Sequence, residues 1–149
     1  MARGPHSLTI DDLLCFALYS AGHTFTRLYK PMLDPLGLTY PQFLVMIALW
    51  EKDDRTVSEI GERLLLESST LTPLLKRLEA AGLIKRTRDR DDERVVRITL
   101  TRQGTALREK AATIPDAIGC ATSLTLNDVK KLAGEVTALR KKLQTALAA

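Results

Sequence analysis

The sequence predicts a mainly α-helical fold with one small β-hairpin, and three features support this prediction. Apolar residues recur at helical spacing near both ends of the chain. Between these ends, two short segments with helix-start signals are separated by a tight polar turn, as in a helix-turn-helix. Directly after them, two segments containing Val and Ile flank a charged tip. With 149 residues, 45% of them hydrophobic, we expect a single unit over residues 1–149.

The first helix is expected to begin at Thr9, because Thr9 and Asp12 match the Thr-x-x-Asp variant of a capping box. Pro31 is expected to end it. Its main apolar stripe, expected to be buried, contains Leu14, Leu18, Ala21, Phe25 and Leu28. A neighbouring stripe contains Cys15, Tyr19 and Tyr29, for which core packing is the simplest interpretation.

Three more helices are expected before the hairpin. One opens at Tyr40 and runs to about Trp50; it is apolar nearly all round and therefore buried. After a charged turn over residues 52–55, Thr56 and Glu59 give another capping-box start. We expect Ile60, Leu64 and Leu65 to share the inner face of that helix. The next helix is expected from Ser69 or Thr70 to Ala81, with Gly82 as its C-terminal cap.

The positive charge of the chain is concentrated in one segment. Ser68–Arg102 contains nine Lys and Arg against five Asp and Glu, and this excess equals the net charge of +4 of the whole chain. Such a local positive field is what binding to a phosphate backbone needs, although chance clustering on a solvated surface is the alternative. We expect Leu71, Leu74, Leu75 and Leu78 to point inward, which leaves hydroxyls and two cations outside to contact bases and phosphates. Pro73 would cost no backbone bond if the N-cap is Thr70 or later.

The hairpin is expected from two strands, 83–88 and 94–100, with a polar tip over residues 89–93. An arginine at such a tip can enter a DNA minor groove.

The remaining chain is expected to form helices that join two copies of the protein. One helix should run from Gln103 to about Ile118, bent near Pro115, with Cys120 at its end. From Thr125 the last helix repeats apolar residues at spacings of three and four, as in a coiled-coil seam; these residues are Val129, Leu132, Val136, Leu139 and Leu143. We therefore expect a homodimer that places two recognition helices on a pseudo-palindromic double-stranded DNA site.

Other classes of protein receive little support from the sequence. The N-terminal residues lack an apolar signal region, and the longest apolar runs are too short to span a membrane, so we expect a soluble, cytoplasmic protein without a membrane partner. The two cysteines, Cys15 and Cys120, lack the spacing of a zinc site or a secreted disulfide framework. His6 and His23 are too few and too far apart to indicate a metal. We expect no metal and no cofactor.

The segment LTPLLKRLEAAGLIKRTRDRDDERVVRITLTRQG, from Leu71 to Gly104, resembles the MarR family of winged helix-turn-helix regulators. The helix, the Gly-Leu-Ile turn, the Asp-x-Arg wing at Asp92 and Arg94, and the closing Leu-Thr-x-x-Gly all match. LLCFALY and YKPMLDPLGLTYPQF look like the OhrR branch of organic-hydroperoxide-sensing repressors. The resemblance implies a winged helix-turn-helix portion over residues 40–102. It also implies a helical dimerisation portion formed by residues 8–30 and 103–147.

The same resemblance implies roles for individual residues. Cys15 would be the reactive thiol, with Tyr29 and Tyr40 as the hydrogen-bonding companions of its thiolate. All three tyrosines of the chain fall in the first 40 residues, so Tyr19 is a further candidate companion. Cys120 would mark the two-cysteine subgroup, in which the oxidised thiol pairs with the second cysteine of the other subunit. Organic hydroperoxide would be the inducer and operator DNA would be released. The residues that we predict to bind DNA are Ser68, Ser69, Thr70, Thr72, Pro73, Lys76, Arg77, Arg86, Arg88, Asp92 and Arg94.

The local sequence alone does not make Cys15 reactive. It lies six positions after the expected helix start, and the carboxylates of Asp11 and Asp12 disfavour a thiolate nearby. Activation would have to come from tertiary donors such as phenolic O–H groups. Tyr29 would lie about 21 Å from Cys15 on one continuous helix. Only a partner subunit, through an antiparallel crossing of the two first helices, could bring these two residues together.

Two alternatives remain open from the sequence. The first is a MarR-type repressor that a small phenolic or aromatic ligand releases from DNA, with Cys15 as inert core. The second is an enzyme, a thiol peroxidase, which the sequence favours less because it shows no redox-partner motif and leaves the basic hairpin unexplained. We therefore expect a regulator and not an enzyme.

Overall fold

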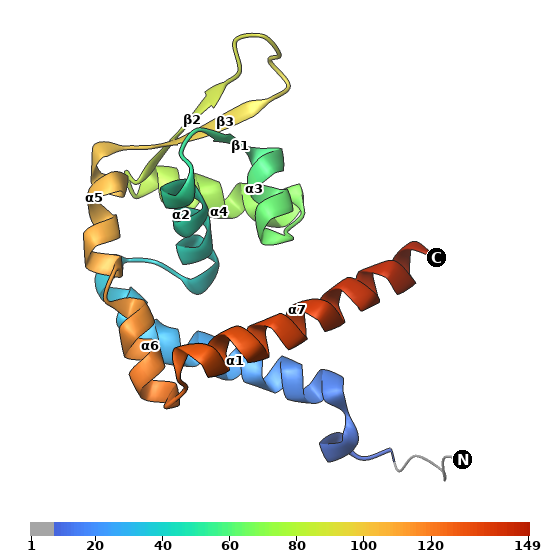
Figure 1. The fold of residues 1–149 in the computed structure, drawn as a ribbon. Helices are drawn as coiled ribbons and strands as arrows, with labels where there is room; N and C mark the ends of the chain where they lie inside the picture. The colour runs from blue at the N-terminus through green and yellow to red at the C-terminus, as the bar shows by residue number, and fades with distance from the viewer. Residues whose placement is uncertain (1–7) are drawn as a thin grey trace. The chain divides into compact units, whose positions relative to one another are not determined.

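The computed structural model describes residues 8–149, which form seven α-helices, two short 3-10 helices and three short strands (Figure 1). The chain divides into two compact units, Met1–Ala111 and Ala112–Ala149. The first unit contains helices α1 to α5 and the sheet, and the second contains α6 and α7. The mainly helical fold with a small β-hairpin is confirmed.

Helix α1 spans Leu14–Leu33 and begins later than the sequence predicted. A separate 3-10 turn, Ile10–Asp12, precedes it. The predicted cap at Thr9 is wrong because the Thr9 hydroxyl donates to the Asp12 carboxylate at 2.6 Å instead of accepting a backbone N–H. Cys15 is therefore the second residue of α1.

The C-terminal end of α1 also differs from the prediction, because the helix continues through Pro31 to Leu33. A proline in the last turn removes a single backbone bond. Beyond it, the Asp34 N–H still bonds to the Lys30 carbonyl, and Lys30 Nζ pairs with the Asp34 carboxylate at 3.1 Å. The stripe that was expected to be buried is largely exposed: Leu14 is 61% exposed and Phe25 is 42% exposed.

Helix α2, Tyr40–Glu51, forms the centre of the first unit, as the sequence predicted. Its N-terminus has a capping box in which Thr39 and Gln42 exchange backbone and side-chain bonds at 3.0 and 3.4 Å. Its buried residues are Gln42, Phe43, Val45, Met46, Ala48 and Leu49.

The next helix, α3, spans Val57–Leu64, and the Thr56 hydroxyl caps it by accepting the Glu59 N–H at 3.1 Å. Ile60 is buried as expected. The prediction for Leu65 is wrong, since it is 54% exposed and ends the helix with a left-handed φ of 58°. A two-residue strand, β1 (Arg55–Thr56), lies where the sequence indicated only a charged turn.

Helix α4 spans Ser68–Ala80 and starts earlier than predicted, with Glu67 as its N-cap. Pro73 is therefore inside the helix, where the N–H that it lacks would otherwise bond to the Ser69 carbonyl. The expectation that Pro73 costs no bond is wrong. Gly82, with a φ of 80°, follows the helix at a position that favours glycine. Three of the four leucines expected inside are buried, and Leu74 is half-buried.

The hairpin consists of β2 (Ile84–Arg88) and β3 (Val96–Leu100), and it projects beyond α3 and α4 (Figure 1). The sheet is antiparallel in the order β1-β3-β2. Arg97, in the middle strand, lies opposite Thr56 of β1 and Thr87 of β2. The prediction that the second strand begins at Arg94 is wrong. Strand β3 begins at Val96, and Arg94 belongs to the tip.

Helix α5, Arg102–Ala111, closes the first unit against the start of the hairpin. Gly104 is buried, and a Cβ there would overlap the Leu83 carbonyl oxygen. The Trp50 indole N–H donates to the Gly104 carbonyl at 3.0 Å. This close approach explains why a glycine closes the Leu-Thr-x-x-Gly motif.

In the second unit, α6 spans Ile114–Thr122 and α7 spans Leu126–Ala148. The single bent helix expected after Gln103 is instead two helices, because Pro115 occupies the first turn of α6, where no N–H is needed. Cys120 lies in the last turn of α6, at a helix end as expected. Thr125 and Asp128 form the capping box of α7.

Among residues 8–149, no single helix is both long and apolar enough to cross a membrane. The pair 14–36 and 40–51, bent by 68°, reaches that length and composition only when taken together.

Candidate nucleic-acid interface and cysteine sites

Helix α4 presents a polar face to solvent, which its buried leucines determine. Leu71, Leu75 and Leu78 are each at most 1% exposed, so the residues between them must face outward. The predicted DNA-binding residues on this helix that are exposed are Ser68, Ser69, Thr70, Pro73, Lys76 and Arg77. Thr72 is half-buried, and its hydroxyl donates to the Ser68 carbonyl at 2.8 Å. Because its proton is donated to the Ser68 carbonyl, the Thr72 hydroxyl is left only as a hydrogen-bond acceptor toward DNA.

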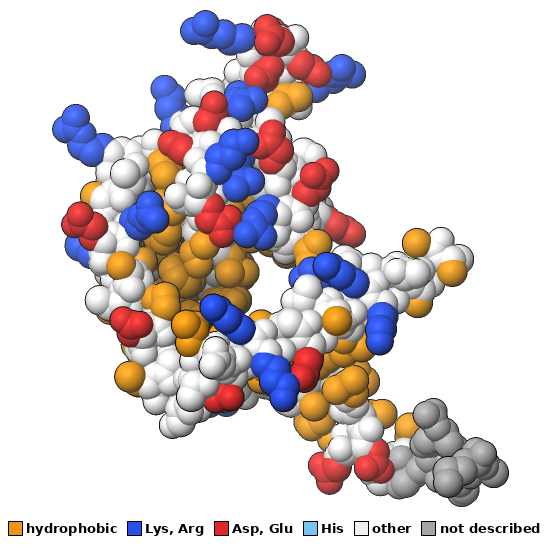
Figure 2. Space-filling model, viewed as in Figure 1, with side chains coloured by type: hydrophobic (Ala, Val, Ile, Leu, Met, Phe, Trp, Pro, Cys, Tyr) orange, Lys and Arg blue, Asp and Glu red, His pale blue; other side chains and the backbone are white. Residues whose placement is uncertain are grey.

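The wing tip is a structured turn from which Arg94 extends into solvent. The Asp92 carboxylate accepts the Arg94 backbone N–H and the Arg94 Nε at 3.1 Å, and the Arg94 Nη2 at 3.2 Å. These bonds, the side-chain bond first, hold the pKa of Asp92 below its ordinary value. The Arg94 side chain is nevertheless 90% exposed. Figure 2 shows Lys or Arg and Asp or Glu side chains intermingled at the hairpin tip.

Two other wing cations that we predicted to bind DNA have protein partners. Arg86 donates its backbone N–H to Glu79 at 2.8 Å and its guanidinium to the same carboxylate at 3.1 Å. Arg88 is exposed, and its Nη1 reaches the Glu93 carbonyl at 3.5 Å. A phosphate contact by Arg86, which is 31% exposed, stays a prediction.

Cys15 is exposed at the positive end of α1. The first bond of the helix runs from the Ala17 N–H to the Leu13 carbonyl, so the Cys15 and Phe16 N–H groups precede the bonded ladder. The expected helix start at Thr9 is wrong, and Cys15 lies in the first turn of α1 instead of further along the helix.

The three tyrosines divide into two groups. The Tyr29 and Tyr40 rings pack at a centroid distance of 4.9 Å with their planes tilted by 51°, and the Tyr29 ring is 6.0 Å from the Phe43 ring. Burial, and to a lesser extent Tyr40, raises the pKa of Tyr29. Tyr19 is 67% exposed and meets the edge of His23 at 4.3 Å.

Within one chain, the structure brings Tyr29 and Tyr40 together but not with Cys15. Cys15 and Tyr29 lie on the continuous helix α1, so about 21 Å of helix separates them. Cys120 is exposed in α6 of the second unit. Residues 8–149 contain no group of three His, Cys, Asp or Glu side chains that could hold a metal ion.

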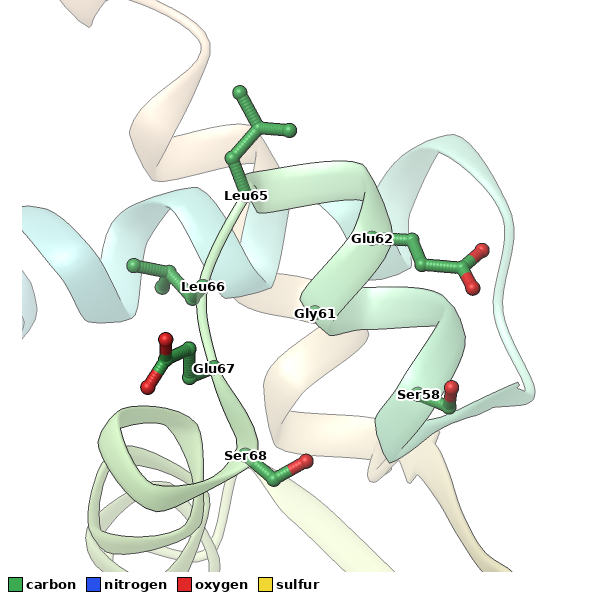
Figure 3. Close-up of a pocket in the computed structure, with 7 residues that line it drawn as sticks. All are labelled: Ser58, Gly61, Glu62, Leu65, Leu66, Glu67 and Ser68. Atoms are coloured by element: carbon green, nitrogen blue, oxygen red, sulfur yellow. The ribbon is translucent and has the colours of Figure 1, made fainter. Parts of the chain in front are cut away.

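An open depression of about 430 Å³ lies at the α3–α4 turn. Figure 3 shows Leu65 and Glu62 extending from α3 in different directions, with Ser68 at the start of α4. Two carboxylates, Glu62 and Glu67, belong to its lining.

The sequence reasoning missed the residues that support the wing. Arg97 appeared only as a strand residue, and Asp89 only as part of a polar tip. Arg97 bonds to Asp54 at 2.8 Å and to Asp89 at 3.4 Å. The only signal in the sequence was that the hairpin and the 52–55 turn carry opposite charges. The sequence around each residue does not indicate which of these charges form a pair.

A helix pair with an exposed polar face, followed by a hairpin that projects a charged tip, defines a winged-helix DNA-binding protein. The family model of the SarA/Rot transcriptional regulators matches residues 27–111. The chain belongs to this MarR-type family of winged-helix transcriptional regulators.

Two relatives cover most of the chain. It is 47% identical over 135 residues to the HTH-type transcriptional regulator TtmR of Methylorubrum extorquens (strain PA1), with 91% of this chain and 69% of that protein covered. It is 44% identical over 136 residues to the organic hydroperoxide resistance transcriptional regulator of Bacillus subtilis (strain 168), with 91% and 92% covered. The resemblance to the OhrR branch is thereby confirmed.

Among solved structures, the chain is similar to AbfR of Staphylococcus epidermidis. The structure of reduced AbfR bound to DNA matches with a TM-score of 0.75 and 37% identity, covering 87% of this chain and 90% of that chain. A disulfide-formed state of AbfR matches with a TM-score of 0.64, covering 85% and 88%.

Proposed function

We propose that this regulator is a repressor that senses organic hydroperoxides by oxidation of Cys15, followed by an intersubunit disulfide with Cys120 and release of operator DNA. The observation that carries the proposal is the exposed Cys15 at the positive end of α1. Because the Cys15 side chain is exposed, a peroxide can reach its sulfur, which oxidation to a sulfenic acid requires. The neighbouring Leu14 and Phe16 are 61% and 41% exposed, and they offer an apolar surface to an organic peroxide.

The proposed sensor requires two subunits. Several large apolar side chains are exposed in the single chain, both on α1 and on α7. They include Leu14, Phe16 and Phe25 on α1, and Leu132, Val136 and Leu143 on α7. Exposed apolar stripes of this kind indicate an interface. Helical portions 8–30 and 103–147 form this interface in our proposal. An antiparallel crossing of two α1 helices then brings the Tyr29 and Tyr40 hydroxyls of one subunit to Cys15 of the other. Tyr19, which is exposed beside His23, is the third candidate donor.

The chemistry balances in two steps. The Cys15 thiolate attacks the terminal peroxide oxygen, the O–O bond breaks, and the alkoxide leaves as an alcohol after taking a proton, which gives a sulfenic acid. The Cys120 thiol of the other subunit then attacks the sulfenic sulfur, which forms the disulfide and releases water. This bond needs the two Cα atoms within about 7 Å. The disulfide-formed state of the similar protein AbfR supports this step.

The disulfide would act on DNA by changing how the two recognition helices are spaced. In the reduced dimer, α4 of each subunit enters a major groove, and the wing arginine Arg94 enters a neighbouring minor groove. An oxidised state that disfavours DNA by about 3 kcal/mol already releases it over a hundredfold. The DNA-bound state of reduced AbfR supports this interface.

The experiment that tests the proposal is a gel shift on DNA from upstream of the protein's own gene. It compares reduced protein, protein treated with an organic hydroperoxide, and treated protein returned to excess thiol. We expect binding to be lost on oxidation and regained on reduction. Cys120→Ser should still form the sulfenic acid but no intersubunit disulfide. Binding that ignores peroxide would return Cys15 to a packing role and favour release by a small ligand.

A further inference from the structure

Arg97, in the middle strand of the sheet, connects two loops that are far apart in the sequence. Its Nε donates to the Asp54 carboxylate at 2.8 Å, and its Nη2 donates to the Asp54 backbone carbonyl at 3.2 Å. Its Nη1 reaches the Asp89 carboxylate at 3.4 Å. One guanidinium, 33% exposed, therefore joins the loop before β1 to the loop of the wing.

The two loops that Arg97 joins are themselves ordered by carboxylates. In the wing, Asp89 Oδ2 accepts the N–H groups of Asp91 and Asp92 at 3.1 and 3.2 Å, and the Asp89 N–H donates to the Val95 carbonyl at 2.8 Å. In the loop before β1, Asp53 Oδ1 accepts the Leu100 N–H at 2.9 Å. The base of the wing is thus fixed on both sides of β3.

A continuous series of bonds leads from Arg97 to Arg94, which with Arg90 is one of two exposed arginines at the tip. Arg97 holds Asp89, Asp89 holds the Asp92 backbone N–H, and the Asp92 carboxylate holds the backbone and side chain of Arg94. Each bond in this series restricts the direction of the next group. A lysine could not replace Arg97, because one ammonium lacks the planar fork that reaches both carboxylates.

We propose that Arg97 is a positioning residue: through Asp54 and Asp89 it sets the direction in which Arg94 leaves the wing, and so determines how well the protein reads an A·T-rich minor groove. Arg97 itself does not contact DNA. The inference rests on the proposed function, in which Arg94 enters a minor groove. A pre-ordered side chain loses less conformational entropy on binding, which is the physical advantage of such a bridge.

The test uses a DNA duplex selected from random sequence by the reduced wild-type dimer. In a second version, 2,6-diaminopurine replaces the outermost adenines of each half-site. This base adds an amino group to the minor groove and leaves the hydrogen-bonding pattern of the major groove unchanged. We expect the wild-type protein to bind the modified duplex about tenfold more weakly, since a lost arginine contact costs about that factor.

The variants separate positioning from stability. For Arg94→Ala and for Arg97→Gln, the affinities for the two duplexes should differ by less than about twofold. The double variant should bind the unmodified duplex no more weakly than the single variant that has the lower affinity. Arg97→Lys keeps the positive charge and serves as the second variant if Arg97→Gln fails to fold. It should also lose the difference in affinity between the two duplexes. Lys85→Gln is the matched control: it removes an exposed charge from β2 and should keep the tenfold effect.

Each other outcome overturns the proposal in a recognisable way. If folded Arg97→Gln or Arg97→Lys keeps the tenfold distinction while Arg94→Ala loses it, the wing reads the minor groove but Arg97 does not position it. If Arg94→Ala also keeps the distinction, the minor-groove contact itself is wrong, and the positioning role is lost with it. Additive effects of the two substitutions on DNA affinity would indicate that Arg97 acts independently of Arg94, which contradicts the positioning role.

Discussion

Arg86 of β2 and Glu79 of α4 form three hydrogen bonds, one from the Arg86 backbone N–H at 2.8 Å and two from its guanidinium at 3.1 Å. This pair joins the recognition helix to the first strand of the wing. Because the two elements would contact different grooves of the same DNA, the pair also fixes the angle between them. The Arg86 backbone N–H, and then its side chain, hold the pKa of Glu79 below its ordinary value of 4.5.

The Glu79 pair should make the stability of the protein depend on acid. A carboxyl whose pKa is lower in the folded state adds stability above its unfolded pKa, and this contribution is lost as the pH falls through the folded value. We expect the wild-type midpoint in urea to fall more steeply than that of Glu79→Gln as the pH drops below about 4.5. The measurement is urea unfolding followed by circular dichroism at several pH values. Parallel curves for the two proteins would show that the pair contributes nothing.

Gly104 should be irreplaceable for a steric reason. A Cβ at this position would overlap the Leu83 carbonyl oxygen, which is backbone and cannot rotate away. We expect Gly104→Ala to lower the free energy of unfolding by about 1–3 kcal/mol, as overpacked sites do. Gly134→Ala is the control, because Gly134 lies in α7 with nothing within 4 Å of the added methyl group. It should be neutral or stabilising by up to about 1 kcal/mol. Equal losses in both variants, measured by urea unfolding, would contradict the close-contact argument.

The parts of the fold that sequence reasoning predicted well are governed by neighbouring residues. The predicted helix start at Thr56 and Glu59 is a local pattern, and the Thr56 hydroxyl does accept the Glu59 N–H at 3.1 Å. Thr9 shows the limit of this reasoning, since its hydroxyl bonds to the Asp12 side chain and α1 begins five residues later. That shift changed the expected environment of Cys15 from a helix interior to a helix end.

The features that sequence reasoning missed depend on long-range pairing. Strand β1 has only two residues and exists because Arg55 lies opposite Ile98 of β3. The bond from Arg97 to Asp54 spans 43 positions. Nothing local to either residue indicates such a partner, so the support of the wing became visible only in the folded chain.

Tyr29 should contribute to peroxide sensing through its proton. Burial raises the pKa of Tyr29, so its hydroxyl stays a hydrogen-bond donor throughout the physiological pH range. We expect Tyr29→Phe to slow sulfenic acid formation at Cys15 by about tenfold, because a hydrogen bond to a charged group contributes roughly 1.5–3 kcal/mol. Lys85→Gln, which removes an exposed charge from β2, is the control and should react at nearly the wild-type rate. The measurement is the rate of trapping with a sulfenic-acid reagent after a pulse of hydroperoxide. Equal rates in all three proteins would remove Tyr29 from the sensor.

The same raised pKa gives a stability prediction at high pH. Because the folded protein holds the Tyr29 proton more tightly than the unfolded chain does, this contribution is complete below about pH 10 and is lost as the pH rises further. Tyr29→Phe should therefore lose less stability than the wild-type protein above pH 10, measured as the shift of the thermal midpoint. A wild-type midpoint that falls no faster than that of Tyr29→Phe would contradict the burial of this hydroxyl.

The apolar seam of α7 should hold the dimer together. Leu132 and Val136 are 52% and 39% exposed in the single chain, and they occupy successive seam positions of the helix. Burying one such side chain contributes about 1.5–3 kcal/mol, and a two-fold interface counts each substitution twice. We expect Leu132→Lys to weaken dimerisation by more than about a hundredfold, which analytical ultracentrifugation measures as a shift to monomer. Lys131→Ala, on the adjoining outer face, should leave the dimer intact. A stable Leu132→Lys dimer would show that α7 is not the interface, and the intersubunit route from Cys15 to Cys120 would then need a different arrangement of the subunits.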